Sequence, residues 1–135
     1  MPVLQDIQVA IRSDPDIVSA RQQGRSLAAA IGFTATDATL IATAISELAR
    51  NIVTYAGRGD VTIRGLEISQ RRGIVIIARD SGPGIRNIDD VLRDGYSTSG
   101  GLGLGLPGVR RLMDEFTIGS ELGHGTTVTV KKWLK

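Results

Sequence analysis

The sequence contains no cysteine, which excludes disulfide bonds, thiolate metal sites and a cysteine nucleophile together. No run approaches the ~18 apolar residues of a membrane-spanning helix, and the N-terminus lacks the basic-then-apolar order of a signal peptide. We therefore expect a cytoplasmic protein that does not bind a membrane. Aromatic residues make up only 4% of the chain and leave bases little to stack on, so nucleic-acid binding is not expected either.

Lysine is absent from almost the whole chain. The three lysines, Lys131, Lys132 and Lys135, lie within the last five residues. A P-loop, which needs a lysine directly after its glycine-rich segment, therefore cannot form. Residues 9–12 read V-A-I-R, a faint echo of the V-A-I-K of eukaryotic-type kinases, but the essential lysine is missing and no H-R-D or D-F-G follows. ATP chemistry in this chain would have to proceed without either kind of phosphate-binding lysine.

The 135 residues, with 41% hydrophobic and 22% charged, suit one globular domain spanning 1–135. Apolar spacing predicts a strand near 9–11, helices at 17–31 and about 37–53, strands at 61–69 and 74–78, a short helix at 88–92, a loop at 94–105, a helix at 107–113, and strands at 116–120 and 126–133. This order has no regular β-α alternation. It predicts an α+β fold, a two-layer α/β sandwich whose mixed, mostly antiparallel sheet has helices on one face.

Local signals suggest where these elements begin and end. Gly32 is expected to end the first long helix, and Thr36 or Asp37 to cap the second. Residues 57–60 should form a turn, and the region around Gly73 should form the hairpin loop between the two middle strands.

The first candidate for chemistry is the pair Glu47 and Asn51 in the second long helix. Their i, i+4 spacing places a carboxylate and an amide side by side on one helical face. A carboxylate can take a proton, and an amide oxygen is a hard ligand suited to Mg²⁺. Taken alone, the pair is more simply explained as two solvated residues on the outer face of the helix.

Three glycine-containing segments complete the set. Asp80 follows the most hydrophobic predicted strand, where its carboxylate can accept a hydrogen bond from a ligand amine, and Gly82 and Gly84 allow close approach of ligand and backbone. The glycines of 100–105 precede a predicted helix start, a combination that suits phosphate. Residues 123–126, Gly-His-Gly-Thr, join the last two strands, and we assign the histidine to that turn without a catalytic role. Individually, these segments could be a polar turn, a flexible hinge and a hairpin connection.

One further glycine pattern is set aside. Residues 103–108 match G-x-G-x-x-G, the dinucleotide-binding fingerprint. That fingerprint needs an apolar strand immediately before it, and residues 94–100 do not have the composition of one. A dinucleotide site is therefore not expected.

In order along the chain, these segments resemble the four boxes of the Bergerat (GHKL) ATP-binding superfamily: E-x-x-x-N at 47–51, D-x-G-x-G at 80–84, G-x-G-x-G at 101–105 and G-x-G-T at 123–126. Within this superfamily, the amino-acid sequences of residues 44–51, 80–85, 95–103 and 106–116 are similar to those of RsbT-type serine/threonine switch kinases of the anti-sigma-factor kinase class. The resemblance runs from about Asp16 to the tail at 132–134. It implies the Bergerat fold and protein serine/threonine kinase activity with ATP and Mg²⁺.

The resemblance also implies how adenine would be bound. Asp80 would accept a hydrogen bond from the adenine amino group, and Thr126 would support that contact through water. Gly82 and Gly84 would let the adenine lie close to the end of the strand.

For the phosphates and the reaction, the resemblance implies a second group of residues. Asn51 would help to hold Mg²⁺, and Glu47 would be the general base that deprotonates an incoming serine or threonine hydroxyl. The phosphates would receive backbone N–H groups from three glycines of a closing loop: Gly101, Gly103 and Gly105.

The same resemblance implies partners: STAS-domain proteins of the stressosome as substrates, and then a PP2C-type phosphatase that the released kinase binds and activates. The nearest alternative is an anti-sigma factor that holds a sigma factor and phosphorylates its antagonist, because it shares all four boxes. Intact Glu47 and Asn51 argue against a pure binding module. A histidine kinase is disfavoured because no phosphoacceptor helix fits in the chain. An exposed helix face could support a homodimer, although nothing in the pattern requires one.

Overall fold

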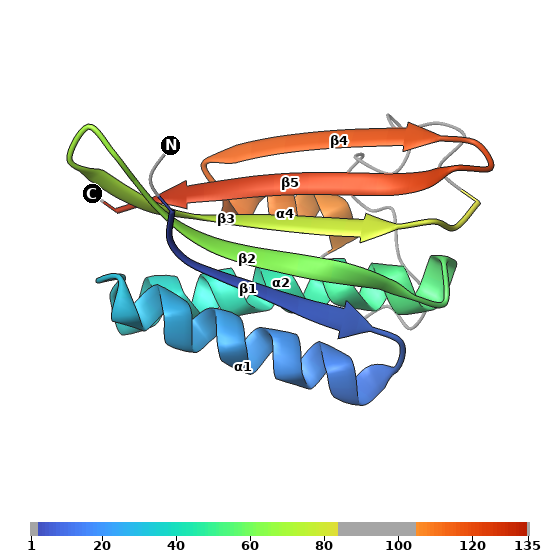
Figure 1. The fold of residues 1–135 in the computed structure, drawn as a ribbon, viewed down its shortest axis with the longest axis horizontal. Helices are drawn as coiled ribbons and strands as arrows, with labels where there is room; N and C mark the ends of the chain where they lie inside the picture. Colours follow the sequence, from blue (N-terminus) through green and yellow to red (C-terminus); the bar gives the residue numbers. More distant parts are fainter. Residues whose placement is uncertain (1–2, 84–104, 135) are drawn as a thin grey trace.

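The computed structural model describes residues 3–83 and 105–134, which form a five-stranded sheet with helices on one face (Figure 1). The predicted short helix at 88–92 and most of the predicted loop lie outside these residues. The elements, in chain order, are β1 (Val3–Ile11), α1 (Asp14–Ala30), α2 (Ala35–Tyr55), β2 (Gly59–Ile68), β3 (Arg71–Asp80), α4 (Gly105–Leu112), β4 (Glu115–Glu121) and β5 (Gly125–Trp133).

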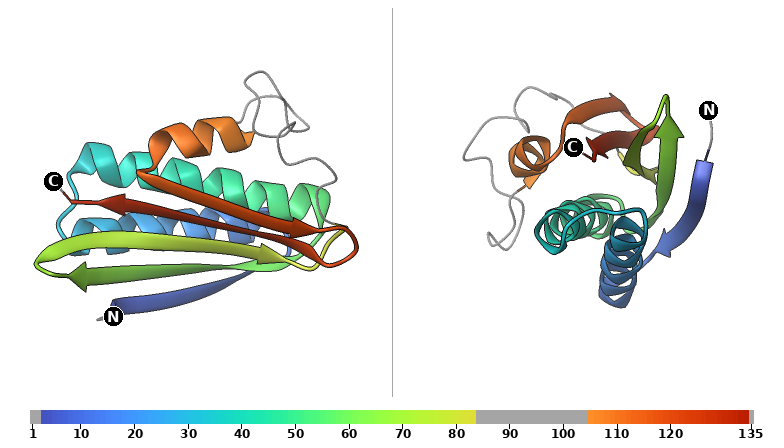
Figure 2. Two further views of the ribbon diagram at one scale, coloured as in Figure 1. Left: turned by 90° about the horizontal axis from the view of Figure 1, so that it is seen from above. Right: turned by 90° about the vertical axis from the view of Figure 1, so that its left-hand side faces the viewer.

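The strand order is β1-β2-β3-β5-β4, so the most apolar predicted strand, β3, lies at the centre as expected. All four pairings among the described strands are antiparallel. The view along the strands shows α2 between α1 and α4 in a single layer against the sheet (Figure 2). The predicted α+β sandwich is therefore confirmed.

The second helix begins earlier than the sequence suggested. Thr34 is the N-cap, and its side-chain oxygen accepts the backbone N–H of Asp37 at 3.1 Å. The prediction of Thr36 or Asp37 as the cap was wrong, because Thr34 already satisfies one of the helix's unpaired N–H groups and leaves Asp37 in the first turn. The predicted stop of α1 at Gly32 is confirmed: Gly32 has a φ of 113°, and the N–H of Phe33 bonds back to Ala28.

The hairpin between β2 and β3 turns at Ser69 and Gln70, not near Gly73 as predicted. Both residues have positive φ, 49° and 69°, the backbone of a type I′ turn. Gly73 lies inside β3, where an added Cβ would crowd the ring of Trp133. The predicted turn at 57–60 is also shorter, because Gly59 and Asp60 already belong to β2.

The core lies between the helix layer and the inner face of the sheet. Its largest fully buried side chains come mostly from α2 and from the sheet, with Val109 from α4; they include Ile41, Ile45, Leu48, Ile63 and Ile76. Burial of such side chains stabilises the fold by about 1.5–3 kcal/mol each. None of the helices in the described part of the chain is long and apolar enough to cross a membrane. Because its apolar stripe is fixed against the sheet, α2 holds its other faces, including the one that carries Glu47, in a defined orientation.

Candidate functional site

One part of the candidate site, which we call the Asp80 end, is formed by the end of β3, the turn after it and the start of β5. Oδ1 of Asp80 accepts the backbone N–H of Gly82 at 2.9 Å and that of Thr126 at 3.3 Å. Both described hydrogen bonds to this carboxylate end on Oδ1, so Oδ2 is the oxygen suited to a ligand donor. The structure thus brings Asp80 and Thr126 together as expected, through the backbone of Thr126.

Two glycines make this packing possible. Gly125 has a φ of 101°, and an added Cβ would collide with the carbonyl oxygen of Asp80. At Gly82, an added Cβ would lie 2.6 Å from the Cβ of Ala56, the residue that follows α2. The strand ends and the end of α2 therefore approach backbone to backbone, and a side chain at either glycine would force them apart.

The side chain of Thr126 has its own partner. Its hydroxyl lies 2.9 Å from that of Ser120, the residue opposite it on β4, and the Ser120 hydroxyl also donates to the carbonyl of Gly125 at 3.1 Å. Such cross-strand hydroxyl pairs add a few tenths of a kcal/mol to about 1 kcal/mol. Ser120 thus fixes the rotamer of Thr126 and holds the β4–β5 turn in place beside Asp80.

The other part, which we call the Glu47 end, lies where α2 meets the start of α4. Glu47 is only 5% exposed. Its Oε1 accepts Nη1 of Arg50 at 2.7 Å, and its Oε2 accepts the backbone N–H of Gly105 at 3.3 Å. The explanation of a solvated outer face is therefore wrong for Glu47, because the start of α4 covers it. A buried polar group needs such partners, because burial without a hydrogen bond costs free energy.

Asn51 lies one turn further along α2. Its Oδ1 is buried and has no hydrogen-bond partner within the described protein. An unpaired buried amide oxygen costs about 1–3 kcal/mol, so a group that satisfies it is expected when the site is filled. A hard neutral oxygen beside a carboxylate suits Mg²⁺, and these residues therefore fit the expected ion.

The glycines expected to contact phosphate are placed only in part. Gly101 and Gly103 lie outside the described residues, as does Gly84, which was expected to lie near the adenine. Gly105 is the first residue of α4, with a φ of 66°, and its N–H is bonded to Glu47. Contact between this N–H and a phosphate stays a prediction. The N–H would have to leave Glu47 in order to donate to a phosphate oxygen.

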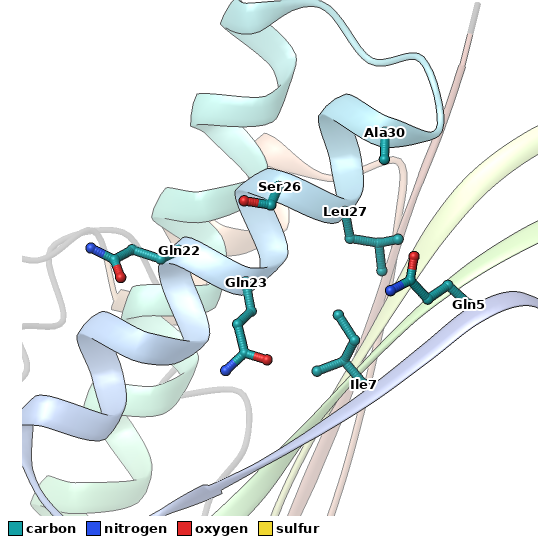
Figure 3. A pocket seen from close by; sticks show the side chains of 7 residues that line it. All are labelled: Gln5, Ile7, Gln22, Gln23, Ser26, Leu27 and Ala30. Atoms are coloured by element: carbon teal, nitrogen blue, oxygen red, sulfur yellow. The ribbon is translucent and has the colours of Figure 1, made fainter.

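A separate pocket lies between β1 and α1 (Figure 3). Its lining comes from two residues of β1 and five of α1: Gln5, Ile7, Gln22, Gln23, Ser26, Leu27 and Ala30. None of its lining residues belongs to the Asp80 end or the Glu47 end, so we assign it no part in the chemistry of those ends.

Three contributors escaped the sequence reasoning: Arg50 as the partner of Glu47, Ser120 as the partner of Thr126, and Gly125 as a site of close approach to Asp80. The spacing of Arg50, three residues after Glu47 on one helix, was a usable signal. The contact of Ser120 depends on the register of β4 against β5, and that of Gly125 on the register of β5 against β3; the composition of the strands reveals neither.

Comparison with known proteins agrees with this geometry. The family described as the histidine kinase-like ATPase domain matches residues 11–132. The chain is 54% identical over 127 residues to the serine/threonine-protein kinase RsbT of Bacillus subtilis (strain 168), covering 94% of this chain and 96% of that protein. It is 31% identical over 133 residues to the anti-sigma F factor of Geobacillus thermodenitrificans (strain NG80-2), covering 95% of this chain and 90% of that protein. The matched family region contains both ends of the candidate site.

A solved structure, the SiaB–SiaC complex from Pseudomonas aeruginosa, contains a chain of similar shape. The TM-score is 0.54 at 12% sequence identity, covering 98% of this chain and 91% of that one. At such low identity the likeness concerns the fold alone, and it supports the two-layer α+β arrangement.

Proposed function

The chain belongs to the histidine kinase-like ATPase domain family, and we propose that it acts there as a partner-switching kinase on STAS-domain proteins of the stressosome. Its 54% identity to RsbT makes it a serine/threonine protein kinase. It uses residues 1–135 as a single kinase domain and transfers the γ-phosphate of ATP to its substrate. When released, it binds and activates a PP2C-type phosphatase.

The observation that carries the proposal is the Glu47 end. A carboxylate that is 5% exposed lies on the same helical face as a buried amide oxygen that has no partner among the described residues. Neither feature contributes to an apolar core, and burying each of these polar groups costs free energy. Together they provide the two groups that phosphoryl transfer needs from the protein: a base for the acceptor hydroxyl and a ligand for the metal.

At the Asp80 end, the protein binds the nucleotide base. Oδ2 of Asp80 accepts a hydrogen bond from the adenine amino group, while Oδ1 stays bonded to the N–H groups of Gly82 and Thr126. Thr126 supports the contact through water. Gly82 and Gly84, which have no side chains, let the adenine lie against the end of β3.

At the Glu47 end, the protein positions and activates the acceptor. Asn51 holds Mg²⁺ through Oδ1, and the ion, when bound, neutralises charge on the phosphates. Backbone N–H groups of Gly101, Gly103 and Gly105 bind the phosphate oxygens. The acceptor oxygen forms a bond to the γ-phosphorus, the bond from that phosphorus to the bridging oxygen of ADP breaks, and Glu47 takes the hydroxyl proton.

The test is a transfer assay with purified protein, Mg-ATP and a purified STAS-domain stressosome protein. We expect phosphate on one serine or threonine of the STAS domain, located by mass spectrometry, and no transfer when Mg²⁺ is chelated. If the protein binds ATP and the STAS partner but transfers nothing, the proposed function is wrong.

A second candidate is an anti-sigma factor that phosphorylates its own antagonist. The 31% identity to an anti-sigma F factor over nearly the whole chain favours it. Stable capture of a sigma factor by the ATP-bound protein would support this candidate. Capture of a PP2C-type phosphatase without a sigma factor would support the stressosome assignment.

A further inference from the structure

We propose that Arg50 is a positioning residue for phosphoryl transfer: its guanidinium fixes one oxygen of the Glu47 carboxylate, so that the other oxygen faces the acceptor hydroxyl. The inference rests on the proposed function, in which Glu47 is the base. It adds which oxygen receives the proton and which side chain decides this.

The two oxygens of Glu47 are held unequally. Oε1 is bonded to Nη1 of Arg50 at 2.7 Å, within the range of charge-assisted hydrogen bonds. Oε2 is bonded to the neutral backbone N–H of Gly105 at 3.3 Å, beyond the usual distance for such a bond. The contact to Oε2 is therefore the weaker of the two, and an acceptor hydroxyl exchanges with it more readily. We assign the proton transfer to Oε2.

Arg50 is well placed for this because both partners are on one helix. Residues three apart on a helix are neighbours, and α2 is held by its buried apolar stripe, so the pair keeps its register as the substrate arrives. The side chain of Arg50 is 43% exposed and that of Glu47 is 6% exposed. Arg50 therefore reaches the carboxylate from the solvent side, and its removal leaves no cavity in the core.

Without Arg50, the carboxylate loses its stronger partner and can rotate about its side-chain bonds. The base then spends less time in the orientation that transfer needs, and a misplacement of about 1 Å can cost about 100-fold in rate. We expect Arg50→Ala to lower the rate at saturating substrate by about 10- to 100-fold. The KM for ATP should stay within about threefold, since Arg50 has no described contact with the Asp80 end and such uninvolved sites act additively.

The test is a double-mutant cycle on the full chain, with single-turnover transfer from Mg-ATP to a purified STAS-domain protein. The variants are Arg50→Ala, Glu47→Ala and the double variant. If Arg50 acts only through Glu47, Arg50→Ala slows the wild-type background and leaves the residual rate of Glu47→Ala unchanged. A matched control is Arg72→Ala, which removes an exposed 3.0 Å ion pair with Glu67 and should transfer at the wild-type rate.

Two results would overturn the inference: Arg50→Ala transferring as fast as wild type or faster, or slowing Glu47→Ala by the same factor as it slows wild type. The second result would mean that Arg50 acts on something other than the base. If Arg50→Ala shows no cooperative melting, Arg50→Lys is put through the same cycle, because an ammonium keeps the charge and lacks the planar fork. A wild-type protein that transfers nothing would instead refute the proposed function.

Discussion

The Asp80 end and the Glu47 end each hold a carboxylate, but by different means. Asp80 is bonded to two backbone N–H groups at the tightly packed ends of strands. Glu47 depends on the side chain of Arg50 and on one long bond from the start of α4. The carboxylate proposed to bind adenine is thus positioned by the fold itself, whereas the carboxylate proposed to act in phosphoryl transfer is positioned by contacts that can be exchanged. Substitutions at the two ends should therefore affect different measurements.

The largest expected effect is on the rate of transfer. Glu47→Gln keeps the size of the side chain and removes its ability to take a proton. We expect the single-turnover rate at saturating Mg-ATP to fall by about 10²- to 10⁴-fold, the contribution of a general base. A rate within about threefold of wild type would show that Glu47 is not the general base. The two ends would then no longer differ in the way proposed.

The next effect concerns ATP affinity. In Asp80→Asn, the amide oxygen can keep the place of Oδ1 beside Gly82 and Thr126, so that the NH₂ group faces the adenine amino group. Two donors then oppose each other, and we expect the Kd for ATP, measured by calorimetry, to rise by about 10- to 100-fold. An unchanged melting temperature serves as the control for folding. Unchanged affinity would contradict the adenine assignment.

A third effect tests whether the Asp80 end depends on its backbone. Gly125→Ala adds a Cβ that would collide with the carbonyl of Asp80 at a positive φ, and we expect the free energy of unfolding to fall by about 2–3 kcal/mol. Gly123→Ala is the matched control: its φ is also positive, at 81°, but nothing lies within 4 Å of an added Cβ. It should lose only about 1–2 kcal/mol in denaturant titrations. Equal losses would mean that the close approach to Asp80 is unimportant.

The smallest effect should come from Thr126→Val. The substitution removes the hydroxyl that meets Ser120 and keeps the backbone N–H that bonds to Asp80. We expect ATP affinity to weaken by about fivefold or less, the cost of one neutral hydrogen bond. A loss as large as that of Asp80→Asn would show that the hydroxyl, and not the backbone, supports the adenine contact.

Much of this arrangement could be predicted from residue patterns. The apolar stripe of α2 and the continuous apolar run of β3 predicted a helix layer against a central strand, because each must bury its apolar face. The ordered boxes correctly placed Asp80 beside Thr126. Element ends were less predictable: Thr34 capped α2 in place of Thr36 or Asp37, and Ser69 and Gln70 made the turn expected near Gly73.

There is a physical reason why the burial of Glu47 could not be predicted from the sequence. A polar residue beside an apolar stripe looks solvated unless another element covers it, and that element, α4, comes more than fifty residues later in the sequence. The pairing of Ser120 with Thr126 likewise depends on how β4 aligns with β5, which neither strand shows when it is considered alone. Sequence reasoning thus placed Asp80 near Thr126 through the ordered boxes, but it missed Arg50 beside Glu47 on one helix and the pairing of Ser120 with Thr126.

The central claim is that Asp80 binds ATP and Glu47 transfers the phosphate. The most direct test measures both ATP affinity and the single-turnover rate at saturating ATP on the same preparations of Glu47→Gln and Asp80→Asn. The account predicts a crossed result: Glu47→Gln binds ATP like wild type and transfers far more slowly, whereas Asp80→Asn binds weakly and transfers at close to the wild-type rate once saturated. If each variant loses both ATP affinity and transfer rate, then ATP binding and phosphoryl transfer are not assigned to separate ends, and the account is contradicted.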